Sequence, residues 1–196
     1  MNKVVYWMTV SLDGFVETSD GNIEWSTPDE GLFRFLSDDA RQAGAFLYGR
    51  RTYELMAAFW PAAGLDPSAP ERVGELAPES VAEFARVWRA KPKVVFSKTL
   101  GSVGHNSRLA REDIAGEVAR LKQEVEGDLV VGGPTLAATF MKRGLIDEYR
   151  LFVRPIVLGG GKPYFPALER PVNVRLVETR TFLGGVVLLR YERGAE

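Results

Sequence analysis

Residues Val130–Phe140 read VVGGPTLAATF, an apolar run followed by two glycines, a proline and an apolar, Ala-rich segment. The valines predict the end of a buried strand, the glycines predict a turn, and Pro134 suits the first position of a helix. A turn without Cβ atoms, next to the free N–H groups of a helix start, can hold an anion. The pattern is neither a Walker loop nor G-x-G-x-x-G, so it leaves open a plain turn or a phosphate-binding turn.

Outward from this turn, short apolar strands alternate with amphipathic helices. We expect strands at residues 3–10, 15–16, 45–49, 93–97, 128–133 and 147–159, and helices at 29–43, 50–60, 79–90, 112–125 and 135–142. Residues 174–182 and 186–192 predict a hairpin. This order predicts an α/β fold with a mainly parallel sheet, helices on both faces and a C-terminal antiparallel hairpin.

The length and composition predict one ordinary globular domain. The 196 residues include 45% hydrophobic and 26% charged side chains, and we expect a single domain over residues 1–196. Residues 61–77 carry three prolines and predict a surface insertion within it.

The charge and the missing cysteines exclude several classes of function. The formal net charge is -1 and there is no cysteine, which removes disulfides, thiolate metal sites and a basic field for nucleic acid. No apolar run approaches the ~20 residues of a membrane span. We therefore expect a cytoplasmic protein that binds no metal, nucleic acid or membrane.

A second strand-to-helix turn has the same arrangement as the first. Residues Tyr48–Glu54 read YGRRTYE, in which the glycine ends a strand and the arginines begin a helix. Arginine is unfavourable at the positive end of a helix dipole, and this placement favours a nearby anion. The alternative is a solvated first turn. The candidate phosphate contacts here are Gly49, Arg50, Arg51 and Thr52.

A third strand end adds a polar pair. Ser97 and Lys98, in FSKTL, follow the strand predicted at 93–97, and by themselves they favour an ordinary polar loop. Open parallel sheets bind ligands at the carboxyl ends of their strands. Three such strand ends together predict a phosphate-rich ligand, such as a dinucleotide.

Four segments in this order resemble a known family. They are SLDGF at 11–15, GRRTYE at 49–54, VVFSKTL at 94–100 and VVGGPTLAATFMKRGLIDEYRLFVRPIVLGGGKPYF at 130–165. The chain resembles the dihydrofolate-reductase-like superfamily, in the branch of the reductase domain of bacterial riboflavin biosynthesis. The resemblance covers nearly the whole chain, with residues 61–77 matching least. Because no zinc deaminase half precedes it, we expect a stand-alone member.

The resemblance implies a three-layer αβα fold with an eight-stranded mixed sheet, and NADPH as hydride donor. It implies phosphate contacts from Gly49, Arg50, Arg51 and Thr52 and contacts to the adenosine ribose and 2′-phosphate from Ser97 and Lys98. It also implies that Gly132, Gly133, Pro134, Thr135 and Leu136 cradle the pyrophosphate and nicotinamide side. Residues from Thr9 to Asp13 would border the nicotinamide and the substrate.

The substrate side has weaker candidates. Asp13 is the candidate catalytic group, and its alternative is a turn residue of the Asp-Gly pair. The other candidate substrate contacts are Thr9, Ser11, Trp25, Trp60 and Lys162. The alternative role of the two tryptophans is packing in the core. The alternative for Lys162 is that it lies in a flexible glycine turn without contacting the substrate. Classical dihydrofolate reductases bind the pterin with a carboxylate on their first long helix, and none of Glu30, Asp38 and Asp39 stands out at that place.

These observations predict an NADPH-dependent reductase of a small planar heterocycle, pterin-like or ribosylaminopyrimidine-like, that acts by hydride transfer. Two alternatives stay open: a nucleotide-binding sensor of the same fold without turnover, and a structural dimer. We expect a homodimer, because the C-terminal strands are apolar.

Overall fold

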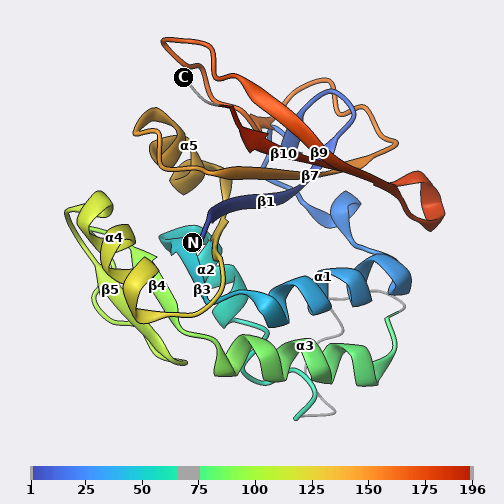
Figure 1. Ribbon diagram of the computed structural model, residues 1–196. Helices are drawn as coiled ribbons and strands as arrows, with labels where there is room; N and C mark the ends of the chain where they lie inside the picture. The colour runs from blue at the N-terminus through green and yellow to red at the C-terminus, as the bar shows by residue number, and fades with distance from the viewer. Residues whose placement is uncertain (1, 66–75, 195–196) are drawn as a thin grey trace. The chain divides into compact units, whose positions relative to one another are not determined.

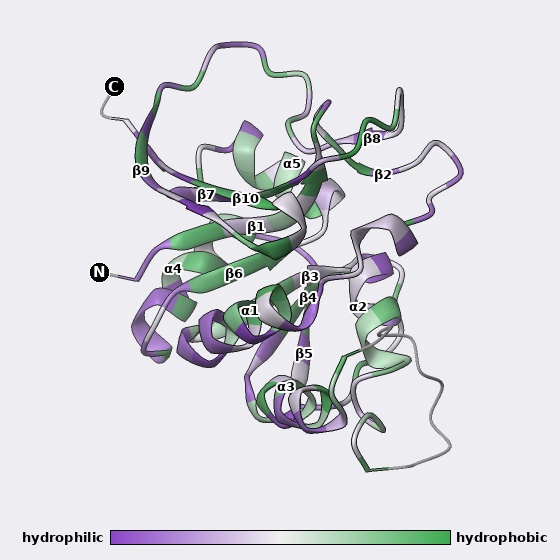
Figure 2. Ribbon diagram, turned by 90° about the vertical axis from the view of Figure 1, so that its right-hand side faces the viewer, coloured by the Kyte–Doolittle hydropathy of each residue, from purple (hydrophilic) through white to green (hydrophobic). Residues whose placement is uncertain are grey.

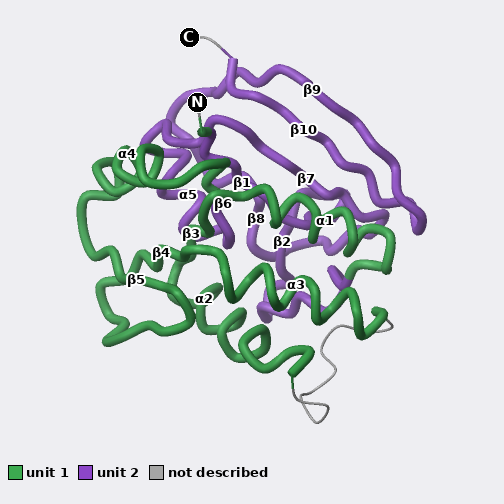
Figure 3. The backbone as a smooth tube through the Cα atoms, turned by 60° about the horizontal axis from the view of Figure 1, so that its bottom comes forward, with its two compact units in different colours: residues 1–2, 28–130 green, residues 3–27, 131–196 purple. Residues whose placement is uncertain are grey.

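The computed structural model describes residues 2–65 and 76–194 (Figure 1). The chain forms two compact units (Figure 3). Unit 1 comprises residues 1–2 and 28–130, and unit 2 comprises residues 3–27 and 131–196. The single domain over residues 1–196 stays a prediction, and much of the predicted insertion at 61–77 lies outside the described residues.

The described residues of unit 1 form four α-helices and the parallel part of the sheet. Its elements are α1 (Glu30–Gln42), β3 (Ala45–Gly49), α2 (Arg50–Ala57), α3 (Pro78–Ala90), β4 (Lys93–Phe96), β5 (Ser107–Ala110), α4 (Ile114–Glu124) and the first half of β6 (Leu129–Gly132). The strand order is β5-β4-β3-β6, and β4 pairs in parallel with both β3 and β5.

Helix α1 begins at a side-chain cap and packs against α3. The Asp29 carboxylate accepts the Leu32 N–H at 2.9 Å, which satisfies one free donor of the first turn. Phe33 of α1 and Phe84 of α3 lie 5.6 Å apart between ring centroids. Figure 2 shows mixed hydrophilic and hydrophobic colour along both helices, as expected for elements with one buried face.

Unit 2 contains the mixed part of the sheet and one α-helix among its described residues. Its elements are β1 (Val4–Ser11), β2 (Phe15–Glu17), η1 (Glu24–Ser26), the second half of β6, α5 (Pro134–Lys142), β7 (Glu148–Arg154), β8 (Lys162–Pro163), β9 (Val174–Thr181), η2 (Leu183–Gly185) and β10 (Val187–Arg193). The strand order is β6-β1-β7-β10-β9. β1 and β7 are parallel, whereas β10 is antiparallel to both its neighbours.

This arrangement confirms the predicted fold class. The strands of the two orders, with β6 counted once, make the eight-stranded mixed sheet that the resemblance implies. The hairpin predicted at the C-terminal end is β9 and β10. Among the described residues, no helix is long and apolar enough to cross a membrane.

Two expected elements are shorter in the structure. Strand β7 ends at Arg154 and does not reach residue 159, because Pro155 has no N–H group to donate and Ile156 donates back to the Arg154 carbonyl at 2.8 Å. Helix α2 ends at Ala57, before the expected residue 60. Strands β5 and β8 were not among the expected strands.

Unit 2 also contains a buried ion network. The Glu148 side chain is fully buried and accepts Lys3 Nζ at 2.9 Å, Arg150 Nε at 2.6 Å and Arg190 Nε at 2.8 Å. Burial by itself would raise the pKa of Glu148. Hydrogen bonds from Arg190 and Lys3 and the charge of Arg150 outweigh that effect and hold the pKa at about 2. The network links the N-terminal segment to β7 and β10.

Candidate functional site

In unit 1, the GRRT and SKT segments lie side by side. The β3–β4 register pairs Gly49 with Phe96, so the residues that follow the two strands begin at the same level. Gly49 is the N-cap of α2, and no side chain caps it. Arg50 donates to Glu54 Oε1 at 2.8 Å and to Thr99 Oγ1 at 3.1 Å, and so joins the start of α2 to the second loop. The structure therefore brings together two of the three predicted phosphate-binding segments.

The loop after β4 is fixed by its own hydroxyl and by a distant arginine. Ser97 Oγ accepts the N–H groups of Thr99 at 3.3 Å and Leu100 at 3.0 Å. The Arg111 guanidinium donates to the carbonyl oxygens of Lys98 at 3.1 Å and Leu100 at 3.0 Å. Lys98 itself is exposed, and within the described residues its ammonium group has no partner. It is the free cation of this loop.

The sequence did not identify Arg111 or Thr99 as site residues. Arg111 directly follows β5, which was not among the expected strands, so nothing indicated that Arg111 returns to the loop after β4. With β5 assigned, the parallel β4–β5 pairing would have placed residue 111 beside residue 97. Ser97 N–H donates to the Ala110 carbonyl at 3.1 Å, which continues that pairing.

In unit 2, the turn between β6 and α5 has the geometry expected of a close backbone approach. Gly133 is the N-cap of α5 with φ +96°, a conformation that side chains rarely adopt, and no side chain caps the helix. Pro134 occupies the first helical turn, as predicted. Thr135 is exposed, whereas Leu136 is buried. The N–H groups of Thr135 and Leu136 belong to the first turn, which has no intrahelical partners.

The Asp13 carboxylate joins the SLDG segment to the glycine-rich loop LGGGKP at residues 158–163. Asp13 Oδ1 accepts the Ser11 hydroxyl at 2.7 Å and the Leu158 N–H at 3.1 Å, and Oδ2 accepts the Gly159 N–H at 2.7 Å. Leu12 N–H donates to the Ile156 carbonyl at 2.8 Å. Two segments more than 140 residues apart are thus held together. We call this set of bonds the Asp13 clasp.

These bonds favour the ionised form of Asp13. The hydrogen bond from Ser11 and then those from the Leu158 and Gly159 backbone hold the pKa of the Asp13 carboxyl below its usual range. An ionised carboxylate accepts hydrogen bonds and cannot supply a proton at neutral pH. The turn role that the sequence left open for Asp13 is the one for which the structure provides contacts.

The remaining unit 2 candidates differ in how many partners they have. Ser11 is buried, and its hydroxyl also accepts the Phe15 N–H at 2.9 Å, whereas Thr9 is half-buried on β1. Lys162 is half-buried in β8, and its ammonium group has no partner among the described residues. The Trp25 indole Nε1 is buried without a hydrogen-bond partner in the part of the chain that the structure describes. These last two donors make no hydrogen bond within the described residues, and the Trp25 Nε1 atom is enclosed by the protein.

Trp60 and Glu30, both in unit 1, are occupied by contacts within that unit. Trp60 is 8% exposed, and its ring lies 4.4 Å from that of Phe84, which is the packing alternative that the sequence left open. The Glu30 carboxylate accepts the Ala77 N–H at 2.9 Å and the Ser80 hydroxyl, and it pairs with Arg34. Hydrogen bonds from Ser80, Ala77 and Arg34 lower the pKa of Glu30 to about 2. Its carboxylate thus binds the start of α3.

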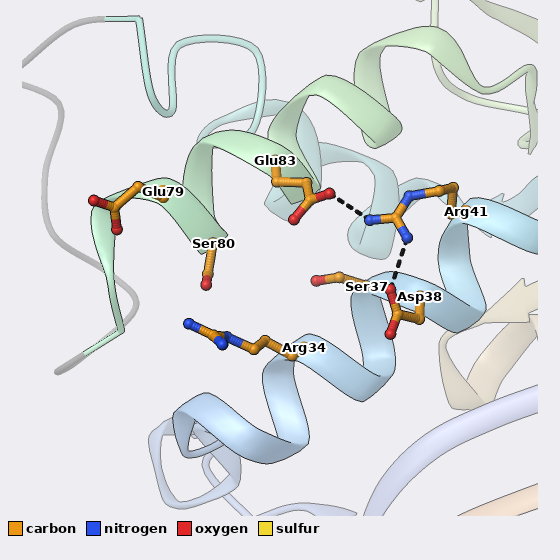
Figure 4. Close-up of a pocket in the computed structure, with 7 residues that line it drawn as sticks. All are labelled: Arg34, Ser37, Asp38, Arg41, Glu79, Ser80 and Glu83. Carbon is orange, nitrogen blue, oxygen red and sulfur yellow. Dashed lines mark hydrogen bonds and ion pairs between the residues drawn. The ribbon is translucent and has the colours of Figure 1, made fainter.

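A polar cavity of about 330 Å³ lies between α1 and α3 (Figure 4). Its lining residues are Arg34, Ser37, Asp38, Arg41, Glu79, Ser80 and Glu83. Arg41 pairs with both Asp38 and Glu83 across it, so its charges are largely compensated. None of the predicted site residues lines this cavity. Within the described ranges, no group of three or more His, Asp or Glu side chains could hold a metal ion.

Comparison with known proteins agrees with this architecture. The family described as the RibD C-terminal domain matches residues 2–188. The uncharacterized protein YyaP of Bacillus subtilis (strain 168) is 33% identical over 192 residues, which cover 96% of this chain and 94% of YyaP.

Two solved structures share the fold. One is a putative riboflavin biosynthesis protein from Shewanella sp. PV-4, with a TM-score of 0.75 and 22% identity over 98% of this chain and 99% of that one. The other is dihydrofolate reductase from Enterococcus faecalis, solved with NADP(H) and RAB-propyl, with a TM-score of 0.64 and 13% identity over 98% and 97% of the two chains. On the family match and the YyaP identity, the chain belongs to the RibD C-terminal domain family.

Proposed function

We propose that this protein is an NADPH-dependent reductase of a small planar heterocycle. The observation that carries the proposal is the pairing of Gly49 with Phe96, which sets the uncapped, arginine-bearing start of α2 beside the Ser97–Lys98 loop. Free N–H groups, a guanidinium and an ammonium group together suit a phosphate-rich ligand. Membership of the RibD C-terminal domain family makes NADPH the ligand that this chemistry fits.

The two units supply different contacts in this proposal. In unit 1, Gly49, Arg50, Arg51 and Thr52 bind phosphate groups of the cofactor, and Ser97 and Lys98 bind the 2′-phosphate. In unit 2, residues 132–136 bind the pyrophosphate and the nicotinamide side with backbone N–H groups. Membership of the RibD C-terminal domain family supports the proposal for each group of contacts. Each can be tested by itself.

The proposed chemistry needs few groups from the protein. NADPH supplies the hydride from C4 of its nicotinamide. The Asp13 clasp fixes the SLDG segment and the glycine-rich loop against each other, so Asp13 acts here as a positioning residue. The Trp25 N–H and the Lys162 ammonium are donors that can orient the heterocycle. Both donors favour a substrate with carbonyl or phosphate oxygens, as in a ribosylaminopyrimidine.

Titration calorimetry and turnover test the proposal. We expect NADPH to bind more tightly than NADH, and Lys98→Gln to reduce that preference while Lys122→Gln, on α4, leaves it unchanged. We then expect NADPH oxidation with one member of a panel of pterins and ribosylaminopyrimidines. Equal affinity for the two cofactors would contradict the assignment.

A second candidate is a nucleotide-binding sensor without turnover. It is favoured by the ionised state of Asp13, because the candidate catalytic group then has no proton to give. It predicts tight NADPH binding with no oxidation across the same panel. The turnover experiment therefore separates the two candidates.

We also propose a homodimer that acts in the cytoplasm. Strand β9 ends the strand order of unit 2 and exposes Val174, Leu176 and Val177 at 42%, 49% and 39%. Exposed apolar side chains on a terminal strand favour association with another chain. Light scattering after gel filtration should give twice the mass of the 196-residue chain, and Leu176→Glu should shift it toward the monomer.

A further inference from the structure

We propose that Arg111 is a positioning residue for cofactor specificity. It would hold Lys98 in place for the 2′-phosphate and thereby set the preference for NADPH over NADH. This inference rests on the function proposed above. It concerns unit 1 alone.

The contacts of Arg111 are made with the loop backbone and span Lys98. Its two terminal nitrogens donate to the carbonyl oxygens of Lys98 and Leu100, at 3.1 and 3.0 Å. A planar guanidinium can bridge two carbonyls that are two residues apart, whereas the compact ammonium group of a lysine cannot replace that fork. The Lys98 backbone is thus anchored on one side by Arg111.

A second set of bonds anchors the same loop from the side of α2. Arg50 donates to the Thr99 hydroxyl, and Ser97 Oγ accepts the Thr99 and Leu100 N–H groups. The backbone from residue 97 to residue 100 is therefore held at several points. The Lys98 side chain has no partner among the described residues, so the anchored loop presents one free ammonium group.

The charges around this loop are mainly positive and suit an anion. Arg50, Lys98 and Arg111 lie on or against the loop, with Glu54 as the carboxylate bound to Arg50. Arg111 donates to the carbonyl oxygens of Lys98 and Leu100 and so offsets part of their negative charge near an incoming phosphate. The 2′-phosphate of NADPH adds a negative charge that NADH lacks, so this arrangement favours NADPH.

Loss of Arg111 should therefore change the preference for NADPH over NADH more than it changes the affinity for NADH. We expect Arg111→Gln to reduce the ratio of NADPH to NADH affinity by up to about fivefold, because exposed charged contacts contribute up to about 1 kcal/mol. NADH affinity should stay within about twofold of the wild type. A role limited to stability would lower both affinities together.

The closing experiment is a cofactor titration of the full chain by calorimetry, with Arg111→Gln, Arg111→Lys, Lys98→Gln and the double variant R111Q/K98Q. Arg120→Gln is the matched control, because Arg120 is an exposed arginine of α4 that pairs with Glu117. We expect both Arg111 variants to lose preference and the double variant to equal Lys98→Gln, since groups that act through one another are not additive.

Three results would overturn the inference. They are an unchanged preference in Arg111→Gln, a full preference in Arg111→Lys, which would leave charge as the only role, and additive losses in the double variant. A wild-type chain without NADPH preference would instead overturn the proposed function itself. The wild-type and variant measurements thus separate the two failures.

Discussion

Glu148→Gln is predicted to lower the stability of the protein through the buried ion network of unit 2. The Glu148 side chain is fully buried and bonded to Lys3, Arg150 and Arg190. Glutamine keeps the shape but removes the negative charge, so several buried or half-buried cations lose their compensation. The change is therefore expected to destabilise β7 and its neighbours.

The magnitude follows from the pKa of the carboxyl group. The folded-state pKa is about 2, against an ordinary glutamate pKa of 4.5. At about 1.4 kcal/mol per pKa unit, that difference corresponds to roughly 3 kcal/mol at neutral pH. The side chains of Lys3 and Arg190 are 33% and 29% exposed, and solvent screens part of their attraction. We therefore expect a loss of about 2–3 kcal/mol in the free energy of unfolding.

The direction of the pKa shift determines how the stability difference between wild type and Glu148→Gln changes with pH. Because the folded pKa of Glu148 is depressed, its contribution is present above pH 4.5 and is lost as the pH falls toward 2. The difference between wild type and Glu148→Gln should fall to less than half of its neutral value by about pH 3.

Urea unfolding of both chains at pH 7, 5 and 3 measures this difference. Glu83→Gln is the control, because its ion pair with Arg41 is about half exposed and should contribute less than ~1 kcal/mol. A loss below about 1 kcal/mol for Glu148→Gln at pH 7, or one that does not change with pH, would refute the reasoning.

Three further predictions concern other parts of the chain. Burial lowers the pKa of Lys93 to about 8. Because the unfolded chain then binds more protons than the folded one, the wild type should gain about 2–3 kcal/mol of stability relative to Lys93→Met as the pH rises from 8 to 10.5. Urea unfolding measures this gain, and a stability difference that does not change with pH would contradict it. Asp13→Asn should speed amide hydrogen exchange at the backbone N–H groups of the clasp by about tenfold, measured by NMR, and unchanged exchange would show that the carboxylate does not hold the loop. Gly161→Ala should lower the free energy of unfolding by about 2 kcal/mol or more, because φ is +138° and a Cβ would collide with the Glu17 carbonyl oxygen. Gly101→Ala is the control, because the space around Gly101 is open. Equal melting temperatures for the two variants in thermal unfolding would contradict the predicted clash.

The fold was largely predictable where the hydrophobic pattern was clear and where glycine or proline marked the ends of the elements. Helix α5 begins at Pro134 as expected, because proline fits the first turn and the preceding glycine supplies a positive φ. Strand β5 was not predicted, because its sequence SRLA has no run of β-branched residues, whereas the equally short β4 and β6 each contain two adjacent valines. Its preceding residues His105 and Asn106 adopt positive φ, which the sequence does not specify.

The candidate site was predictable in its residue types but not in its pairings. The sequence left a turn open as the alternative role at both Asp13 and Lys162, yet the bonds from Leu158 and Gly159 to Asp13 join positions 145 and 146 residues apart. Local pattern carries no information about such a contact. The same limit applied to Trp60, whose partners Phe33 and Phe84 lie on two different helices.

The distribution of partners among the polar side chains bears on which heterocycle the protein takes. A pterin held in the manner of classical dihydrofolate reductases needs a carboxylate on the first long helix. The Glu30 carboxylate of α1 is instead bonded to the start of α3. In unit 2, the Asp13 carboxylate is likewise bonded within its own clasp. Two of the predicted substrate contacts in unit 2 have no partner among the described residues and carry only donor groups, the Lys162 ammonium and the Trp25 indole N–H. Donors recognise carbonyl and phosphate oxygens, so under the proposed function this inventory favours an oxygen-rich pyrimidine over a protonated pterin.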